Sequence, residues 1–100
     1  MIRKEGILTQ VKIQLLFKIR EFWEETGFPP KVNDLRSLGG KTYAGPTITY
    51  HLGDLIRWGY VHARELKNGK HDSWKLTEKG IELIGAEEIY ITIEGEGKKR

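Results

Sequence analysis

Residues 45–76 decide the fold, and they read GPTITYHLGDLIRWGYVHARELKNGKHDSWKL. The first part of this stretch has the start and stop signals of a helix. Pro46 suits the first helical position with Gly45 as the cap, and Gly59 stands where the chain must leave the helix. Apolar residues at positions 48, 52, 55 and 56 form one stripe at helical spacing. The stretch therefore predicts a helix over about 46–58.

The second part of the stretch predicts a hairpin. Two strand-like runs, over 60–66 and 71–76, flank Asn68-Gly69. Asn-Gly between alternating segments predicts a two-residue type I′ turn, because that turn needs positive φ at both positions. The resulting register pairs Val61 with Leu76, His62 with Lys75, Ala63 with Trp74, Arg64 with Ser73, Glu65 with Asp72 and Lys67 with Lys70. The last two pairs place like charges opposite each other, at a cost of roughly a few tenths of a kcal/mol each.

Two further helices are predicted before this stretch. Thr9 suits the N-cap of a helix that runs to about Thr26 and stops at Gly27. Ile13 and Phe17 lie opposite its broad apolar stripe. The stripe consists of Leu8, Val11, Leu15, Leu16, Ile19, Phe22 and Trp23. After the extended segment Phe28-Pro29-Pro30, a short second helix is expected to turn Val32, Leu35 and Leu38 inward and to end at Gly39-Gly40.

The remaining residues predict a short helix and a strand. Thr77 suits the cap of a helix over 78–84. After Gly85, the run Ile89-Tyr90-Ile91-Thr92-Ile93 alternates apolar and polar positions and predicts a C-terminal strand. Residues 95–100 are polar, and we expect them to form a disordered tail. The sequence thus predicts one domain over residues 1–94, followed by this tail.

This order of elements resembles that of a winged helix-turn-helix domain. Gly27-Phe28-Pro29-Pro30, with a short helix ending at Leu38-Gly39, is similar to the DNA-binding domain of the LexA repressor. Thr47-Ile48-Thr49-Tyr50-His51-Leu52, Leu55 and Gly59-Tyr60-Val61 resemble the recognition helix and first wing strand of many bacterial and archaeal regulators. Trp74-Lys75-Leu76-Thr77-Glu78-Lys79-Gly80-Ile81-Glu82-Leu83 resembles the end of the wing and the next helix in MarR- and PadR-type regulators.

The resemblance covers most of residues 8–84, and it implies both a fold and a function. The fold would be an α+β winged helix-turn-helix, with three helices, a two-stranded wing, a short fourth helix and a C-terminal strand. The function would be that of a sequence-specific transcription regulator of double-stranded DNA. Its recognition helix, about 46–58, would enter the major groove, and its wing, 60–76, would follow the backbone or the minor groove.

Composition and charge narrow the class of protein. The chain has 100 residues with 17 Lys and Arg, 14 Asp and Glu, and no Cys, so disulfides and thiolate metal sites are excluded. Residues 31–76 hold eight basic and four acidic side chains, which places the positive excess on the predicted DNA-binding elements. No apolar run approaches the roughly 20 residues of a membrane span or resembles a signal peptide, so we expect a cytoplasmic protein. Four Asn and Gln in total favour a thermophilic source.

The candidate DNA-binding residues surround an exposed aromatic side chain. Tyr50 lies opposite the buried stripe of the predicted helix, where it serves no folding purpose but could contact phosphate or a base edge. Gly53 costs about 1 kcal/mol of helix propensity, which close approach of a DNA backbone would explain. The predicted DNA-binding residues are Lys41, Thr42, Tyr43, Thr47, Thr49, Tyr50, Arg57, Arg64, Lys67, Asn68, Lys70 and His71.

Other functions remain as alternatives or are not predicted. The protein could be a winged-helix interaction module of a transcription or replication assembly, with the Tyr50 face binding protein, or more distantly an RNA-binding adaptor. The sequence predicts no enzyme, no cofactor and no metal, because its three His are spaced eleven and nine residues apart and no catalytic constellation can be argued. Ile13 and Phe17, together with the Ile89–Ile93 run, form a leftover apolar surface. Either the C-terminal strand folds back over the first helix within one chain, or these surfaces join two chains, and the second case predicts a homodimer.

Overall fold

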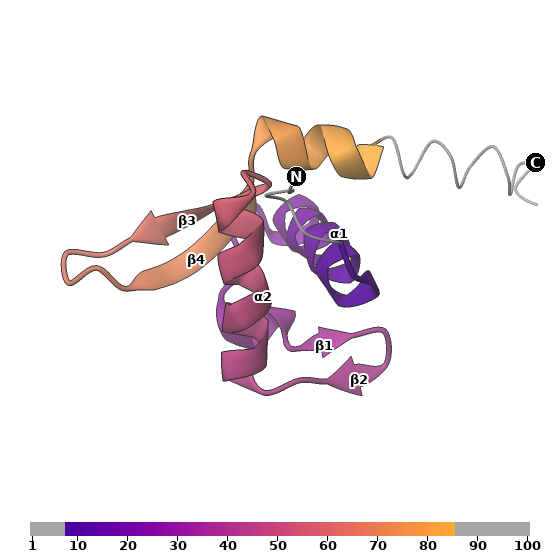
Figure 1. Ribbon diagram of the computed structural model, residues 1–100, viewed down its shortest axis with the longest axis horizontal. Coiled ribbons are helices and arrows are strands. Elements are labelled where there is room, and N and C mark those ends of the chain that lie inside the picture. The colour runs from indigo at the N-terminus through magenta and orange to yellow at the C-terminus, as the bar shows by residue number, and fades with distance from the viewer. Residues whose placement is uncertain (1–7, 86–100) are drawn as a thin grey trace, which may run out of the picture.

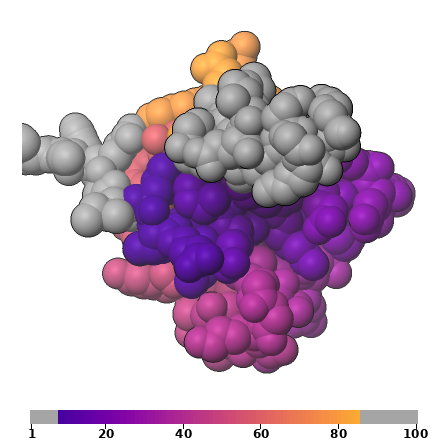
Figure 2. All heavy atoms as spheres, turned by 90° about the vertical axis from the view of Figure 1, so that its right-hand side faces the viewer, coloured from indigo at the N-terminus to yellow at the C-terminus, as the bar shows by residue number. Residues whose placement is uncertain are grey.

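A computed structural model describes residues 8–85. Two hairpins project in different directions from a centre of packed helices, and a last helix over residues 78–85 lies across one end (Figure 1). From another side, the smaller hairpin forms a protrusion below the first helix (Figure 2). The elements are α1 (Gln10–Thr26), the 3₁₀ helix η1 (Val32–Leu35), β1 (Ser37–Leu38), β2 (Lys41–Thr42), α2 (Gly45–Arg57), β3 (Val61–Glu65) and β4 (His71–Leu76).

Helix α1 begins and ends where the sequence predicts. The Thr9 side chain accepts a hydrogen bond from the backbone N–H of Lys12 at 3.4 Å, and left-handed Gly27 ends the helix. Leu15, Leu16 and Ile19 of the predicted stripe are buried. Trp23 is 44% exposed, so the prediction that it belongs to the core is wrong. The Trp23 ring lies beside β4 instead, with the Lys75 ammonium 5.5 Å from its ring centre.

The predicted second helix is mostly a hairpin. Only Val32–Leu35 is helical, and β1 then pairs antiparallel with β2, with Leu38 opposite Lys41. Gly39 and Gly40 have φ of 57° and 82°, which is the positive pair that a type I′ turn requires. The two glycines therefore turn the chain back on itself instead of simply ending a helix. Leu38 still reaches the core, but from a strand.

Helix α2 carries the predicted buried stripe, and its start differs by one residue from the prediction. Ala44, not Gly45, is the N-cap, and the Ala44 carbonyl accepts hydrogen bonds from the N–H groups of Thr47 and Ile48 at 3.1 and 3.2 Å. Pro46 lies in the first turn, where its missing N–H costs nothing. Three side chains of the stripe are buried, namely Ile48, Leu52 and Leu55.

The wing, which we define as β3, β4 and their connecting loop, has the predicted pairs at its base. Val61 faces Leu76, His62 faces Lys75, Ala63 faces Trp74 and Arg64 faces Ser73. The outer part differs from the prediction, because the ladder shifts register between Arg64 and Glu65, and Glu65 then faces His71. The predicted pairs of Glu65 with Asp72 and of Lys67 with Lys70 are therefore wrong.

The wing loop has three residues instead of two. The N–H of Gly69 donates to the Leu66 carbonyl at 2.9 Å, and the N–H of Leu66 donates to the Lys70 carbonyl at 2.7 Å. Gly69 alone has positive φ, at 83°, while Asn68 keeps negative φ and accepts from the Lys70 N–H through its side chain. A three-residue loop with glycine in the left-handed position is the next most common way to close a hairpin. The added loop residue and the bulge separate the like charges and bring Arg64 within 3.7 Å of Asp72.

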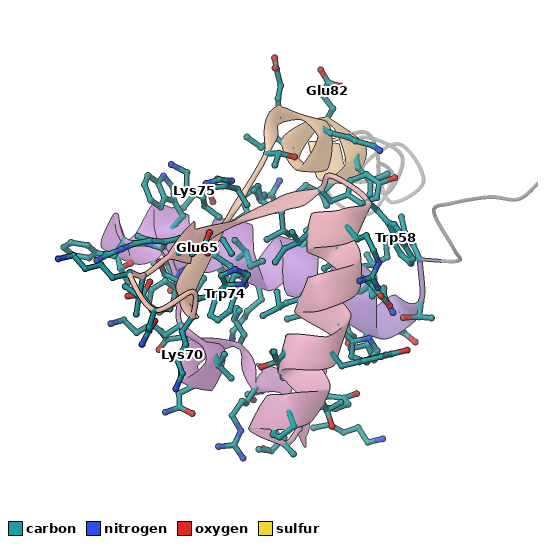
Figure 3. The ribbon with its side chains drawn as sticks, turned by 60° about the vertical axis from the view of Figure 1, so that its left-hand side comes forward. Trp58, Glu65, Lys70, Trp74, Lys75 and Glu82 are labelled. Carbon is teal, nitrogen blue, oxygen red and sulfur yellow. The ribbon has the colours of Figure 1, made fainter. Side chains whose placement is uncertain are left out.

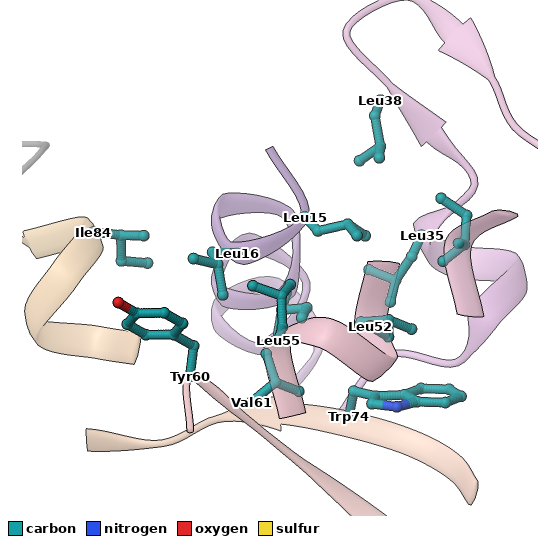
Figure 4. Packing of buried hydrophobic residues seen from close by; sticks show 12 residues of the cluster. Leu15, Leu16, Leu35, Leu38, Leu52, Leu55, Tyr60, Val61, Trp74 and Ile84 are labelled. Atoms are coloured by element: carbon teal, nitrogen blue, oxygen red, sulfur yellow. The ribbon is translucent and has the colours of Figure 1, made fainter. Parts of the chain in front are cut away.

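The core joins every element except β2, whose two residues are exposed (Figure 4). Helix 78–85 is capped by Thr77 as predicted, since its hydroxyl oxygen accepts from the Gly80 N–H at 3.1 Å and its proton goes to the Gly59 carbonyl at 2.6 Å. The buried apolar side chains are Leu15, Leu16, Ile19, Leu35, Leu38, Ile48, Leu52, Leu55, Tyr60, Val61, Trp74 and Ile84. The predicted strand Ile89–Ile93 and the tail 95–100 lie outside the described residues.

Gly80 tests how tightly helix 78–85 packs. A Cβ added there would lie 2.2 Å from the carbonyl oxygen of Tyr60, which is backbone and cannot move aside cheaply. We expect Gly80→Ala to lower the free energy of unfolding by about 1–3 kcal/mol in urea denaturation, as overpacking does. The control is Gly53→Ala in α2, where nothing lies within 4 Å of the added Cβ; it should raise stability by roughly 0.5–1 kcal/mol. Equal midpoints for the two variants would contradict this packing.

Candidate nucleic-acid interface

The outer face of α2 is set by its buried stripe. Because Ile48 and Leu52 face the core, Tyr50 and Arg57 lie on the opposite side of the helix. Tyr50 is 67% exposed, and its ring meets the His51 ring edge-on, with 5.6 Å between ring centres. Thr47, three residues before Tyr50, is also exposed. The structure thus brings these predicted residues together on one solvent-facing side of α2.

A groove of about 520 Å³ separates α2 from the wing. Trp74 reaches from the wing toward α2, whereas Lys70 lies at the outer end of the wing (Figure 3). Four predicted site residues line the groove, namely Thr49, Arg57, Lys70 and His71. Its remaining lining is Val32, Leu52, Gly53, Ile56 and Trp74. The groove therefore has an apolar floor between basic edges.

The basic side chains of this region differ in how far they are neutralised. Arg57 forms an ion pair with Asp54 on the same helix, and Arg64 is paired with Asp72. Lys67 and Lys70 are exposed, and within residues 8–85 neither forms an ion pair. The positive charge available to a polyanion is therefore concentrated at the tip of the wing.

The remaining predicted residues lie beside the start of α2. Lys41 and Thr42 are exposed on β2, and the Lys41 ammonium lies 5.9 Å from the centre of the Tyr43 ring. Tyr43 is half-buried, and its backbone carbonyl accepts from Nε of Arg36 at 2.7 Å. Figure 1 shows the β1–β2 hairpin at the N-terminal end of α2 and the wing on another side. The candidate residues thus flank α2 from two directions.

Sequence reasoning missed Lys12, which lies beneath this face. The side chain of Lys12 is buried in α1, with its Nζ 3.3 Å from Oδ2 of Asp54 and 3.0 Å from Nδ1 of His51. The same ammonium lies 6.0 Å from the ring centre of Tyr50 and 5.7 Å from that of Trp58. The signal was available, because at 100° per residue position 12 falls inside the apolar stripe of α1.

Burial and Lys12 together change the acidity of His51. A lysine ammonium can only donate, so Nδ1 of His51 accepts from Lys12 and the imidazole proton resides on Nε2. Burial, followed by the positive charge of Lys12, lowers the pKa of His51 below its ordinary value, and Asp54 opposes this shift. His51 is therefore held as the neutral imidazole.

The described residues offer no metal site and no membrane span. Within residues 8–85, no three His, Cys, Asp or Glu side chains are grouped so that they could hold a metal ion. None of the helices described is both long and apolar enough to cross a bilayer.

Comparison with known proteins identifies the fold. No family model and no curated protein sequence matches the chain. A solved structure of a Staphylococcus aureus MepR mutant superposes with a TM-score of 0.67 and 20% sequence identity, over 91% of this chain and 64% of the MepR chain. This chain thus spans less than two thirds of the length of that neighbour. The likeness shows an α+β winged-helix fold, as the sequence predicted.

The lowered pKa of His51 makes stability depend on pH. Because the folded state binds this proton more weakly than the unfolded chain does, the stabilisation is present above the ordinary pKa near 6.5 and is lost as pH falls through the folded-state pKa. We expect urea midpoints to fall on acidification through this window. His51→Asn should flatten that part of the profile, whereas His62→Asn on exposed β3 should leave it in place. Superimposable profiles for wild type and His51→Asn would exclude a role for His51.

Proposed function

We propose that this chain is a sequence-specific transcription regulator that binds double-stranded DNA in the cytoplasm. The observation that carries the proposal is the outer face of α2, where an exposed Tyr50 stands beside a groove with basic edges. MepR, a winged-helix regulator, supports a role of this kind. The similarity to the LexA DNA-binding domain stays an expectation.

In this proposal α2 enters the major groove, which admits a helix and presents a distinct pattern at each base pair. Thr47 and Tyr50 lie on the exposed side and would contact base edges or the thymine methyl group. Gly53 lines the groove beside α2, and no protein atom would meet a Cβ there. The absence of a side chain at Gly53 would instead leave room for a DNA backbone.

The wing would bind phosphates beside that groove. Lys67 and Lys70 are exposed and unpaired within residues 8–85, while His71 and Arg57 face each other across the groove. Phosphate contacts of this kind supply affinity and register without reading sequence. Asn68 at the wing tip and Arg64, which is 68% exposed despite its pairing with Asp72, would add to them.

We also propose that the protein acts as a homodimer, and the described residues favour a surface other than the one around Ile13 and Phe17. Phe17 packs against the core cluster, Ile13 is half-buried, and Ile89–Ile93 lies outside the described residues. Within residues 8–85 the exposed large apolar side chains are Trp23, Phe28, Tyr50 and Ile81, and of these Trp23 and Ile81 line one cavity of about 240 Å³. An exposed apolar surface of this kind favours a protein interface.

A protein-interaction module is the second candidate function. The observation in its favour is the same exposed Tyr50, because tyrosine is enriched in the centres of protein interfaces. The two functions differ in their response to salt, since only phosphate contacts release counterions.

Four alanine variants separate sequence reading from phosphate binding. Tyr50→Ala and Thr47→Ala should change stability by no more than about 0.5 kcal/mol and should each cost about 1–3 kcal/mol on the preferred duplex, with far less effect on scrambled DNA. Lys67→Ala and Lys70→Ala should weaken both duplexes about equally and reduce the slope of log affinity against log salt by about one each.

Fluorescence-anisotropy titrations at two salt concentrations, using a duplex selected from random DNA and its scrambled counterpart, provide the measurement. Unchanged binding by the Tyr50 and Thr47 variants would show that α2 does not read the sequence. A wild-type affinity that does not respond to salt would favour the protein-interaction function.

Light scattering tests the homodimer. We expect a mass about twice the 11.6 kDa of the monomer at micromolar concentrations. Ile81→Lys should shift the population toward the monomer, because it places a charge in the apolar surface. The matched control is Tyr50→Lys on the outer face of α2, which should leave the mass unchanged. A monomeric wild type, both free and bound to DNA, would rule out the dimer.

A further inference from the structure

Lys12 is a buried cation that the proposed DNA contacts do not use. Its side chain is 6% exposed and lies between α1 and the face of α2 next to Tyr50. We propose that Lys12 positions α2 for DNA and that protonation of His51 breaks this anchor, so that DNA binding weakens as pH falls. The functional half of this proposal rests on the DNA-binding function proposed above.

The contacts of Lys12 connect the interior to the proposed reading face. Oδ2 of Asp54 faces Lys12, while Oδ1 of Asp54 faces Arg57 on the exposed side of α2. Asp54 therefore bridges a buried cation of one helix and an exposed cation of the next. Breaking a buried ion pair is costly, because one charge is left without its partner. The bridge accordingly restricts the rotation of α2 about its own axis. It also holds the Arg57 side chain in place at the groove.

Protonation of His51 is incompatible with this arrangement. The neutral imidazole offers Nδ1 as an acceptor to Lys12 at 3.0 Å. The imidazolium carries a proton on both nitrogens, so two cationic donors would meet at that distance with no acceptor between them. Among residues 8–85, Asp54 is the acid that acts on His51, and it already serves Lys12 and Arg57. Either the ring or the lysine must then leave its place.

The charged groups that act on His51 come from the two helices that meet there. Lys12 of α1 disfavours the protonated ring, and Asp54 of α2 favours it. The other elements packed on α2 are η1 and β3. The pKa of His51 is shifted by neither Asp34 of η1 nor Arg64 and Glu65 of β3.

The movement would reach the proposed DNA face directly. The His51 ring meets the Tyr50 ring edge-on, and the Lys12 ammonium lies beneath Tyr50. Displacing either partner therefore disturbs Tyr50, and freeing Asp54 changes the pairing of Arg57. His71 lines the groove from β4, so the binding test removes its imidazole in order to isolate the effect of His51.

The binding test uses the His71→Asn background, in which the wing has no imidazole at the groove. The duplex is the one that binds most tightly among those recovered from a random-sequence pool. The affinity of this variant for it should fall about threefold to tenfold between about pH 7.5 and about pH 5.5, because one pKa unit corresponds to a factor of ten. The double variant His51→Asn/His71→Asn keeps an acceptor where Nδ1 was and should stay within about twofold. Equal losses in both proteins, or no loss in the first, would overturn the proposal.

A second measurement needs no DNA. In a proton NMR titration, the amide resonances of Tyr50 and Asp54 should follow the same curve as the His51 ring. Lys12→Met should raise the pKa of His51 and uncouple those amides from it, and Lys12→Arg, which retains the charge, should restore part of the coupling. Amides that ignore the His51 titration would overturn the proposal even if DNA binds. If no duplex binds at any pH, the DNA-binding function fails alone, because the anchor is still tested by NMR.

Discussion

The packing of α2 against α1 is the constraint on which the rest of the structure depends. Leu52 and Leu55 are buried against the side of α1 that carries Leu15 and Leu16 (Figure 4). Full burial of each such side chain stabilises the folded state by about 1.5–3 kcal/mol. This contact also fixes the orientation of α2, since turning the helix to expose a different face would remove these leucines from the core. The same burial that folds the chain therefore selects the residues that face solvent.

The parts of the fold that the sequence predicted correctly are those governed by periodicity and capping. Thr9 and Thr77 cap the helices expected of them, and the base of the wing pairs as the alternation of its residues required. Such patterns repeat along a segment, so each residue supports the same conclusion. The predicted faces of α1 and α2 hold for the same reason, with two exceptions on α1. Trp23 is 44% exposed, and Phe17, which was expected opposite the core, packs against it.

The errors lie where one residue decides between two structures. Gly39-Gly40 can end a helix or turn a hairpin, and only the partner strand at Lys41-Thr42 settles which one forms. Asn68-Gly69 was expected to close a two-residue turn, but the wing is closed by a three-residue loop with a bulge, and the shifted register leaves Arg64 3.7 Å from Asp72. Lys12 was overlooked because a lone cation in an apolar stripe gives no hint of its partners, which come from a helix about forty residues later.

The register shift at Arg64 divides the wing into two parts with different ties to the domain. The core includes Tyr60, Val61 and Trp74. The backbone N–H of Trp74 donates to the backbone carbonyl of Pro30 at 3.1 Å. Beyond the shift, residues 64–72 contribute no side chain to that core. Substitutions or length changes in the outer part would thus leave the packing intact, while the inner part and α2 cannot vary so freely. In evolution, the outer segment can therefore change in sequence and in length without any change to the packing of the core.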